Sequence, residues 1–258
     1  MQDYWVKQQD KPAFPDLLWS RPVNKSSAGK LVIIGGNLHG FNIVANAFNS
    51  AQKAGAGTIR LVLPDALQKL LGKIIPEAEF APSTTSGSFA KLALNEISNA
   101  VNWADGVLLV GEFGKNSETA ILLENIVKNI SIPLVIAGDT IDELLNNPGL
   151  LSKSNIIIGA EFSQLQKLAI NTKYSQAFTS TMTILKFVET LHDFAKTKNI
   201  NVVTYFEGQT FVSTEGRVSS TRTGYSLDKI AAKVSVWYMQ NPDKKFEAAT
   251  TSLVNNNS

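Results

Sequence analysis

The sequence predicts an α/β fold: a doubly wound, mostly parallel sheet with helices on both faces and a β-hairpin at one edge. Two observations predict it. Short apolar runs recur along the chain, and stretches with apolar residues at helical spacing separate them. The composition is that of a globular protein, since 44% of the 258 residues are hydrophobic and 18% are charged.

Six apolar runs predict buried strands. They lie at 31–34, 59–63, 107–110, 134–137, 156–158 and 202–205. Apolar residues at helical spacing over 89–101 and 121–130 predict helices between them. Ligands of such sheets bind at the carboxyl ends of the strands, so we expect a site there.

The last third of the chain changes character. Two β-rich runs flank Glu207-Gly208 and predict a hairpin over 202–218. The residues 227–238 then have helical periodicity, with Ser226 as a candidate N-cap and Asn241-Pro242 as the end. Because no repeat or linker interrupts the chain, we expect one domain over 1–258, with an N-terminal extension over 1–20 and a frayed tail over 250–258.

Composition excludes several classes of function. The 24 basic and 22 acidic residues give a net charge of +2, and the basic residues are scattered, so no nucleic-acid partner is expected. The absence of cysteine excludes disulfides and thiolate metal sites. The chain has no signal-peptide pattern and no apolar run of ~20 residues, which predicts a cytoplasmic protein without a membrane partner.

The most specific segment covers 25–64, which reads as strand, glycine turn, helix, glycine turn and strand. Gly35 and Gly36 follow the first strand, where missing side chains would let a ligand approach the backbone and the helix N-terminus. Ordinary tight turns explain such glycines about as well. His39 lies in the same loop, and His192 in a helical run is expected to be packed or at the surface; with two histidines in the chain, no metal site is predicted.

The stretches GK-LVIIGG and AGAGTIRLVLP resemble the opening of the ADP/ATP-dependent NAD(P)H-hydrate dehydratases, a family of the ribokinase-like superfamily. The register continues from about Arg21 to Trp237. The resemblance implies a ribokinase-like fold and a carbon–oxygen lyase that repairs nicotinamide cofactors. It implies hydrated NADH or NADPH as the substrate, and ATP or ADP with Mg²⁺ as cofactors. Members of the family often assemble, so a homo-oligomer is also an open expectation.

The resemblance assigns candidate roles to individual residues. Asp228 would be the catalytic base. The candidate substrate-binding residues are Gly35, Gly36, Asn37, His39 and Asp139. The candidate nucleotide-binding residues are Gly111, Gly114, Thr210, Thr223, Gly224 and Ser226.

Several motifs depart from the family pattern. In the GPGLG-like loop over 110–114, Glu112 replaces proline and adds a negative charge. Only Asp139 remains of the carboxylates of a DADAL-like motif, and it would also suit an ordinary helix cap. The TPH-x-x-E-like positions at 159–164 keep neither the histidine nor the glutamate. Phe206 and Glu207 replace the lysine and glycine of a KG-x-x-T motif, which keeps Thr210.

The family's TGGSGD motif reads TGYSLD here, over 223–228. Its glycines let successive backbone N–H groups face a phosphate, the helix dipole adds favourable charge, and the carboxylate takes a proton. Side chains on Tyr225 and Leu227 restrict that backbone geometry. Asp228 therefore fits two roles equally well: a general base, or an acidic residue stabilised by the dipole of its helix.

Three functions remain open from the sequence. The first is the ATP- or ADP-dependent dehydration of hydrated NAD(P)H. The second is a catalytically impaired homologue that acts as a nucleotide-binding or assembly protein, which the lost glycines favour. The third is a small-molecule kinase acting on a vitamin precursor, which the opening segment fits less well.

Overall fold

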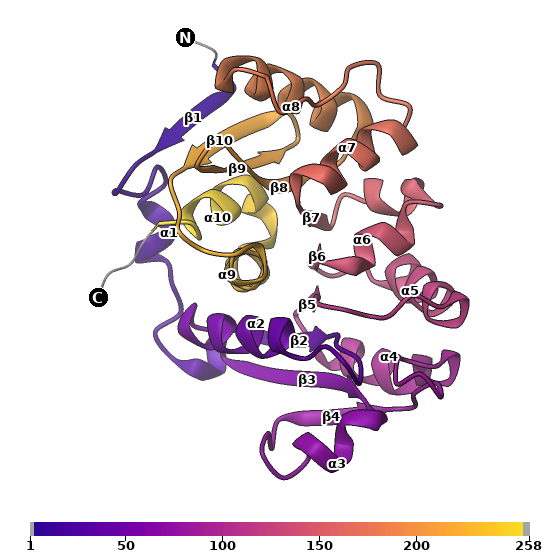
Figure 1. Cartoon of the computed structure of the whole chain (residues 1–258). Helices are drawn as coiled ribbons and strands as arrows, with labels where there is room; N and C mark the ends of the chain where they lie inside the picture. The colour runs from indigo at the N-terminus through magenta and orange to yellow at the C-terminus, as the bar shows by residue number, and fades with distance from the viewer. Residues whose placement is uncertain (1–2, 255–258) are drawn as a thin grey trace.

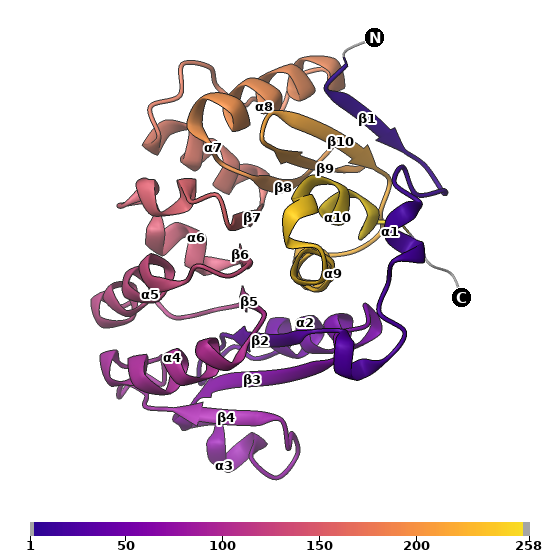
Figure 2. The ribbon, with the colours of Figure 1, turned by 180° about the vertical axis from the view of Figure 1, so that it is seen from behind.

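The computed structural model describes residues 3–254, and its strands form one ten-stranded sheet (Figures 1 and 2). The strand order is β1-β10-β9-β8-β7-β6-β5-β2-β3-β4. The strands are β1 (Trp5–Gln8), β2 (Lys30–Ile34), β3 (Thr58–Pro64), β4 (Ala78–Ala81), β5 (Gly106–Leu109), β6 (Leu134–Ala137), β7 (Ile156–Ala160), β8 (Val202–Phe206), β9 (Gln209–Thr214) and β10 (Arg217–Thr221).

The sheet is parallel except at β9, which runs antiparallel to both of its neighbours. Each of the six predicted strands is present. The predicted fold class is therefore confirmed, with an almost wholly parallel sheet whose central strands are buried on both faces.

Helices cover both faces of the sheet. The helices are α1 (Asp16–Trp19), α2 (Asn42–Lys53), α3 (Gln68–Leu71), α4 (Leu94–Trp103), α5 (Ser117–Asn129), α6 (Asp139–Leu144), α7 (Phe162–Asn171), α8 (Ile184–Lys198), α9 (Leu227–Gln240) and α10 (Lys245–Thr251). The longest, α8, has 15 residues. Within residues 3–254, no helix combines the length and apolar character that a membrane crossing requires.

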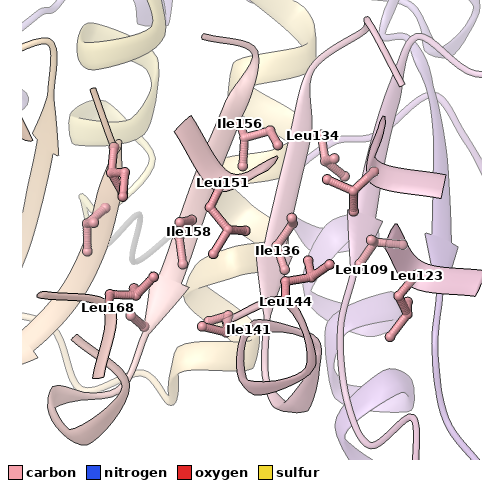
Figure 3. Packing of buried hydrophobic residues seen from close by; sticks show 14 of the residues in the cluster. Leu109, Leu123, Leu134, Ile136, Ile141, Leu144, Leu151, Ile156, Ile158 and Leu168 are labelled. Atoms are coloured by element: carbon pink, nitrogen blue, oxygen red, sulfur yellow. The ribbon is translucent and has the colours of Figure 1, made fainter. Parts of the chain in front are cut away.

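The alternation of side chains along each strand separates two hydrophobic cores. Val32 and Ile34 of β2 point to the core under α4, α5, α7 and α8, whereas Leu31 and Ile33 point to the core under α2, α9 and α10. Figure 3 shows the first of these cores, where leucine and isoleucine side chains from β5, β6 and β7 meet those of the helices above them. Two buried faces fix the register of every central strand.

The predicted hairpin is confirmed as β8 and β9. Glu207 (φ 45°) and Gly208 (φ 74°) make its two-residue turn, in which both backbones are left-handed. The hairpin lies near one end of the sheet, but β1 forms the outermost strand there by pairing in parallel with β10. The predicted N-terminal extension thus contributes a sheet strand.

The C-terminal tail differs from the expectation. Residues 250–254, predicted to fray, are buried: Thr250 and Leu253 expose none of their surface, because α10 packs this segment on β9 and β10. The rest of the predicted tail, 255–258, lies outside the described residues. The prediction that the chain frays from residue 250 is therefore wrong, because the segment over 250–254 packs on the sheet.

Candidate functional site

The candidate residues lie at the carboxyl ends of the parallel strands, which we call the carboxyl edge of the sheet. Gly35, Gly111 and Gly138 lie just beyond the ends of β2, β5 and β6, which are adjacent parallel strands. β10 runs in the same direction as β8, so the chain reaches the same edge at Thr221 and α9 begins there. This is the edge at which the sequence predicts a site.

The glycine loops after β2, β5 and β6 touch one another through their backbones. A Cβ atom on Gly35 would lie 1.8 Å from the carbonyl oxygen of Val110. One on Gly138 would lie 2.8 Å from the carbonyl oxygen of Gly111, which accepts a hydrogen bond of 3.3 Å from the Asp139 N–H. Backbone packing therefore explains these glycines, whatever ligand the loops also hold.

Asn37 braces the loop after β2. Its side chain is 6% exposed; Oδ1 accepts hydrogen bonds from the N–H groups of His39 (2.7 Å) and Gly40 (3.0 Å). Its Nδ2 donates to the carbonyl of Glu112 at 3.1 Å. Asn37 thus joins the first two glycine loops, and the side chain of His39 is exposed.

The Glu112 carboxylate lies against the loop after β2. A Cβ on Gly40 would approach its Oε2 to 2.3 Å. The family's proline is replaced here by a negative charge on the loop that the resemblance assigns to the nucleotide. Gly114 has a packing role, since a Cβ there would lie 2.1 Å from Oγ of Ser88.

Asp139 is the first residue of α6, and Gly138 occupies the cap position. The ordinary cap that Asp139 would also suit is therefore not what the structure shows. Burial raises the pKa of Asp139, and the nearby carboxylates of Glu112 and Asp142 raise it further, whereas Lys115 opposes them. The carboxylate is thus held where its negative charge is poorly compensated.

Asp139→Asn is expected to raise the melting temperature at pH 7. With its folded-state pKa above the ordinary value of 3.8, the wild-type carboxylate contributes stability at low pH that is lost as the pH rises through the folded pKa. The gain in the variant should therefore shrink towards zero below pH 3.8. Melting curves between pH 3 and pH 8 measure this gain. A gain independent of pH would contradict a raised pKa of Asp139.

The stretch over 159–164, where the family has TPH-x-x-E, has a structural role here. Glu161 and Gln164 form a capping box at the start of α7. Gln164 Nε2 also donates to the Gly138 carbonyl (3.0 Å) and to Asp142 (2.8 Å). Although burial raises the pKa of Asp142, hydrogen bonds from Lys167 and Gln164 bring it below its usual value. Gln164 therefore braces the loop that carries Asp139.

The positions that match the KG-x-x-T motif have two different roles, one for the replaced Phe206 and one for the retained Thr210. The ring of Phe206 stacks on those of Phe187 (4.3 Å between centroids) and Phe162 (5.3 Å), and is buried in the core instead of facing a ligand. Thr210, which is fully buried, shares a hydrogen bond of 2.7 Å with the hydroxyl of Thr223. That bond ties the hairpin to the loop before α9.

The loop over 223–228 is open. Ser226 occupies the N-cap position of α9, but its side chain makes no capping hydrogen bond. No residue of the loop has a positive φ, and a Cβ on Gly224 would meet nothing within 4 Å. Asp228 is half-buried in the first turn and makes no hydrogen bond or ion pair within the part of the chain that the structure describes.

Sequence reasoning missed the charged residues around Asp139. Lys115 acts on Asp139, Asp142 and Glu143, and burial together with those two aspartates raises the pKa of Glu143. The positions of Asp142 and Glu143, three and four residues after Asp139, were the available signal. No group of three metal-ligating side chains occurs among residues 3–254.

The fold is similar to that of solved ribokinase-like proteins. A ribokinase-like superfamily protein from Enterococcus faecalis superposes with a TM-score of 0.71 at 16% identity, covering 98% of this chain and 86% of that one. The ADP/ATP-dependent NAD(P)H-hydrate dehydratase from Bacillus subtilis, co-crystallised with ATP and Mg²⁺, gives 0.60 at 11% identity, covering 90% and 81%. Both likenesses show the fold.

At the level of sequence, the chain is similar to the bifunctional NAD(P)H-hydrate repair enzyme of Salinibacter ruber, with 26% identity over 123 residues. The match spans 46% of this chain and 23% of that enzyme. No protein-family model matches the chain. The resemblance to NAD(P)H-hydrate repair enzymes is therefore confirmed at the level of sequence over about half of the chain.

Proposed function

We propose that the protein dehydrates hydrated NADH or NADPH with ATP or ADP, and that its site is the carboxyl edge described above. One observation carries the proposal: the N-terminus of α9 opens at that edge without a side-chain cap, and Asp228 lies in its first turn with no partner among residues 3–254. An uncapped helix N-terminus favours a phosphate, and an unpaired carboxylate is free to accept a proton.

The residues present fit a nucleotide with Mg²⁺. Ser226, Thr223 and Gly224 would hold the phosphates at the start of α9, and Asp139 would orient the hydrated metal. Mg²⁺ bound to phosphates needs only one or two protein carboxylates, so a larger acidic cluster is not required. A bound nucleotide would supply a phosphoryl group to the hydroxyl of the substrate and leave as the diphosphate or monophosphate, and loss of the resulting phosphate with a proton from the neighbouring ring carbon would restore the double bond.

The chain's own residues would then do three things. The loops with Gly35, Gly36 and Asn37 would hold the hydrated nicotinamide, because they follow the carboxyl end of β2 and Asn37 fixes their shape. Asp228 would take the proton of the hydroxyl group through its carboxylate. Recovery of NADH absorbance from its hydrate, with ATP and Mg²⁺ present, tests the proposal.

A catalytically impaired homologue that binds nucleotide or acts in assembly is the second candidate. Two observations favour it: the loop over 223–228 lacks a left-handed residue, and Glu112 places a carboxylate on the glycine loops. A nest of backbone N–H groups commonly needs a left-handed residue, and a carboxylate repels phosphate.

Leu227→Gly is expected to strengthen ATP binding about two- to fivefold, which corresponds to the ~0.3–1 kcal/mol of a helix-terminus interaction. Leu227 is the first residue of α9, where glycine would let the backbone turn its N–H groups towards a phosphate. Isothermal calorimetry measures the affinity for ATP, and Leu227→Ala is the control for lost side-chain packing. Unchanged affinity would mean that the phosphates bind elsewhere or not at all.

A further inference from the structure

A pocket lies away from the glycine loops, between α2, α9 and the end of α10 with the residues that follow it. It has a volume of about 710 Å³. Its walls consist of Arg21, Asn46, Asn49, Ser50, Lys53, Ala54, Tyr225, Lys229, Lys233, Trp237, Thr251, Ser252 and Val254. We call it the α2–α9 pocket. None of the candidate substrate-binding, nucleotide-binding or catalytic residues lines it.

Two helical stripes build the α2–α9 pocket. Residues 229, 233 and 237 of α9 follow one another at intervals of four, and Tyr225 continues this spacing just before the helix. On α2, the residues 46, 49, 50 and 53 share one face. Both views show α9 between α2 and α10 (Figures 1 and 2), and α2 is in extensive contact with α9. The pocket therefore belongs to two packed helices.

The charge in this pocket has one sign. Arg21, Lys53, Lys229 and Lys233 line it, and no aspartate or glutamate does. In the described part of the chain, none of these four cations forms an ion pair with a carboxylate. Low-dielectric walls strengthen the field of such a cluster, so the pocket attracts multiply charged anions.

Two of the cations are held inside the wall. Lys233 Nζ lies 3.4 Å from the Val254 carbonyl and 4.4 Å from the centre of the Tyr225 ring. Arg21 donates to the Ala54 carbonyl at 2.5 Å and lies over the ring of Trp237. Burial lowers the pKa of both Lys233 and Arg21. Their contacts fix them in place, and no described carboxylate compensates their charges.

We propose that the α2–α9 pocket binds a small polyphosphate-bearing anion. The pocket adjoins the loop over 223–228 through Tyr225, but none of the candidate nucleotide-binding residues lines it. The four cations match several phosphate charges, and lysine and arginine are the side chains that bind phosphate most often. The amides of Asn46 and Asn49 and the hydroxyl of Ser50 add donors on the α2 side. The volume suits a metabolite of nucleotide size.

Calorimetric titration with inorganic triphosphate tests the proposal. Lys53→Gln/Lys233→Gln is expected to weaken binding at least about tenfold, because it removes two charged contacts. Lys128→Gln/Lys196→Gln removes the same charge from exposed helix positions outside the pocket and is expected to change affinity less than about twofold. Equal weakening by both double variants, unchanged affinity in the pocket variant, or no binding by the wild type would overturn the site.

A spin label locates the anion while all four cations remain. The chain has no cysteine, so a nitroxide attached to Gln52→Cys is the only label and lies at an exposed position of α2 beside the pocket. A nitroxide on Lys128→Cys of α5 is the control. The ³¹P signals of triphosphate are expected to broaden with the first label and not with the second. The reverse pattern would overturn the proposal. Repeating the titration with ATP distinguishes a nucleotide from a free polyphosphate as the source.

Discussion

Asp228→Asn is expected to lower the turnover of hydrated NADH by about a hundredfold to ten-thousandfold, the range that a positioned general base contributes. Asparagine keeps the shape of the side chain but cannot accept a proton. Because Asp228 makes no hydrogen bond or ion pair in the described structure, the fold loses only its interaction with the α9 dipole, worth ~0.3–1 kcal/mol. The melting temperature should therefore change little.

Asp243→Asn provides the matched control, because Asp243 is an exposed aspartate in the turn beyond the other end of α9. Its turnover should equal that of the wild type. Steady-state rates with hydrated NADH, ATP and Mg²⁺ measure both variants. Full activity in Asp228→Asn would show that Asp228 is only an acidic residue at a helix start.

Gly35→Ala is expected to destabilise the fold by about 2–3 kcal/mol, as overpacking of a tight contact does. The added Cβ would lie 1.8 Å from the Val110 carbonyl oxygen, which belongs to the backbone and cannot rotate away. The ends of β2 and β5 would have to separate, and the loops that carry the candidate site move with them. Urea denaturation measures the loss as a lower midpoint.

Gly224→Ala is the corresponding control in the loop before α9. Nothing lies within 4 Å of the position of its Cβ, and its φ is not left-handed, so its free energy of unfolding should stay within about 0.5 kcal/mol of the wild type. A Gly35→Ala variant as stable as Gly224→Ala would mean that the β2 and β5 loops do not meet as closely as described.

The buried strands and the long helices were predictable from local pattern. Runs such as 31–34 and 156–158 are apolar because both of their faces are covered, and that signal survives without tertiary information. β1 and β4 were missed. Their sequences, WVKQ and AEFA, are short and polar in part, and they form strands because a neighbouring strand pairs with them at the edges of the sheet.

The position of the candidate site could be predicted from the order of strands and helices, but the contacts inside the site could not. Sequence placed Gly35, Gly111, Asp139 and Asp228 at strand ends or helix starts, which the structure brings to one edge. The bracing by Asn37 and Gln164 joins loops far apart in sequence, and no periodicity encodes it.

The basic pocket was hidden for a related reason. The basic residues look scattered along the chain, because more than two hundred positions separate Arg21 from Lys233. Only the packing of α2 on α9 collects them. The spacing of four between Lys229, Lys233 and Trp237 was visible in the sequence, but the face of α2 that packs against them was not.

The recovery of NADH absorbance is the most direct test of the proposed function. Purified protein is mixed with hydrated NADH, Mg²⁺ and either ATP or ADP, beside an active dehydratase from another source. We expect a nucleotide-dependent rise in absorbance that disappears in Asp228→Asn. No rise with the wild-type protein, while the active control enzyme recovers its substrate, would contradict the dehydratase and favour the catalytically impaired homologue.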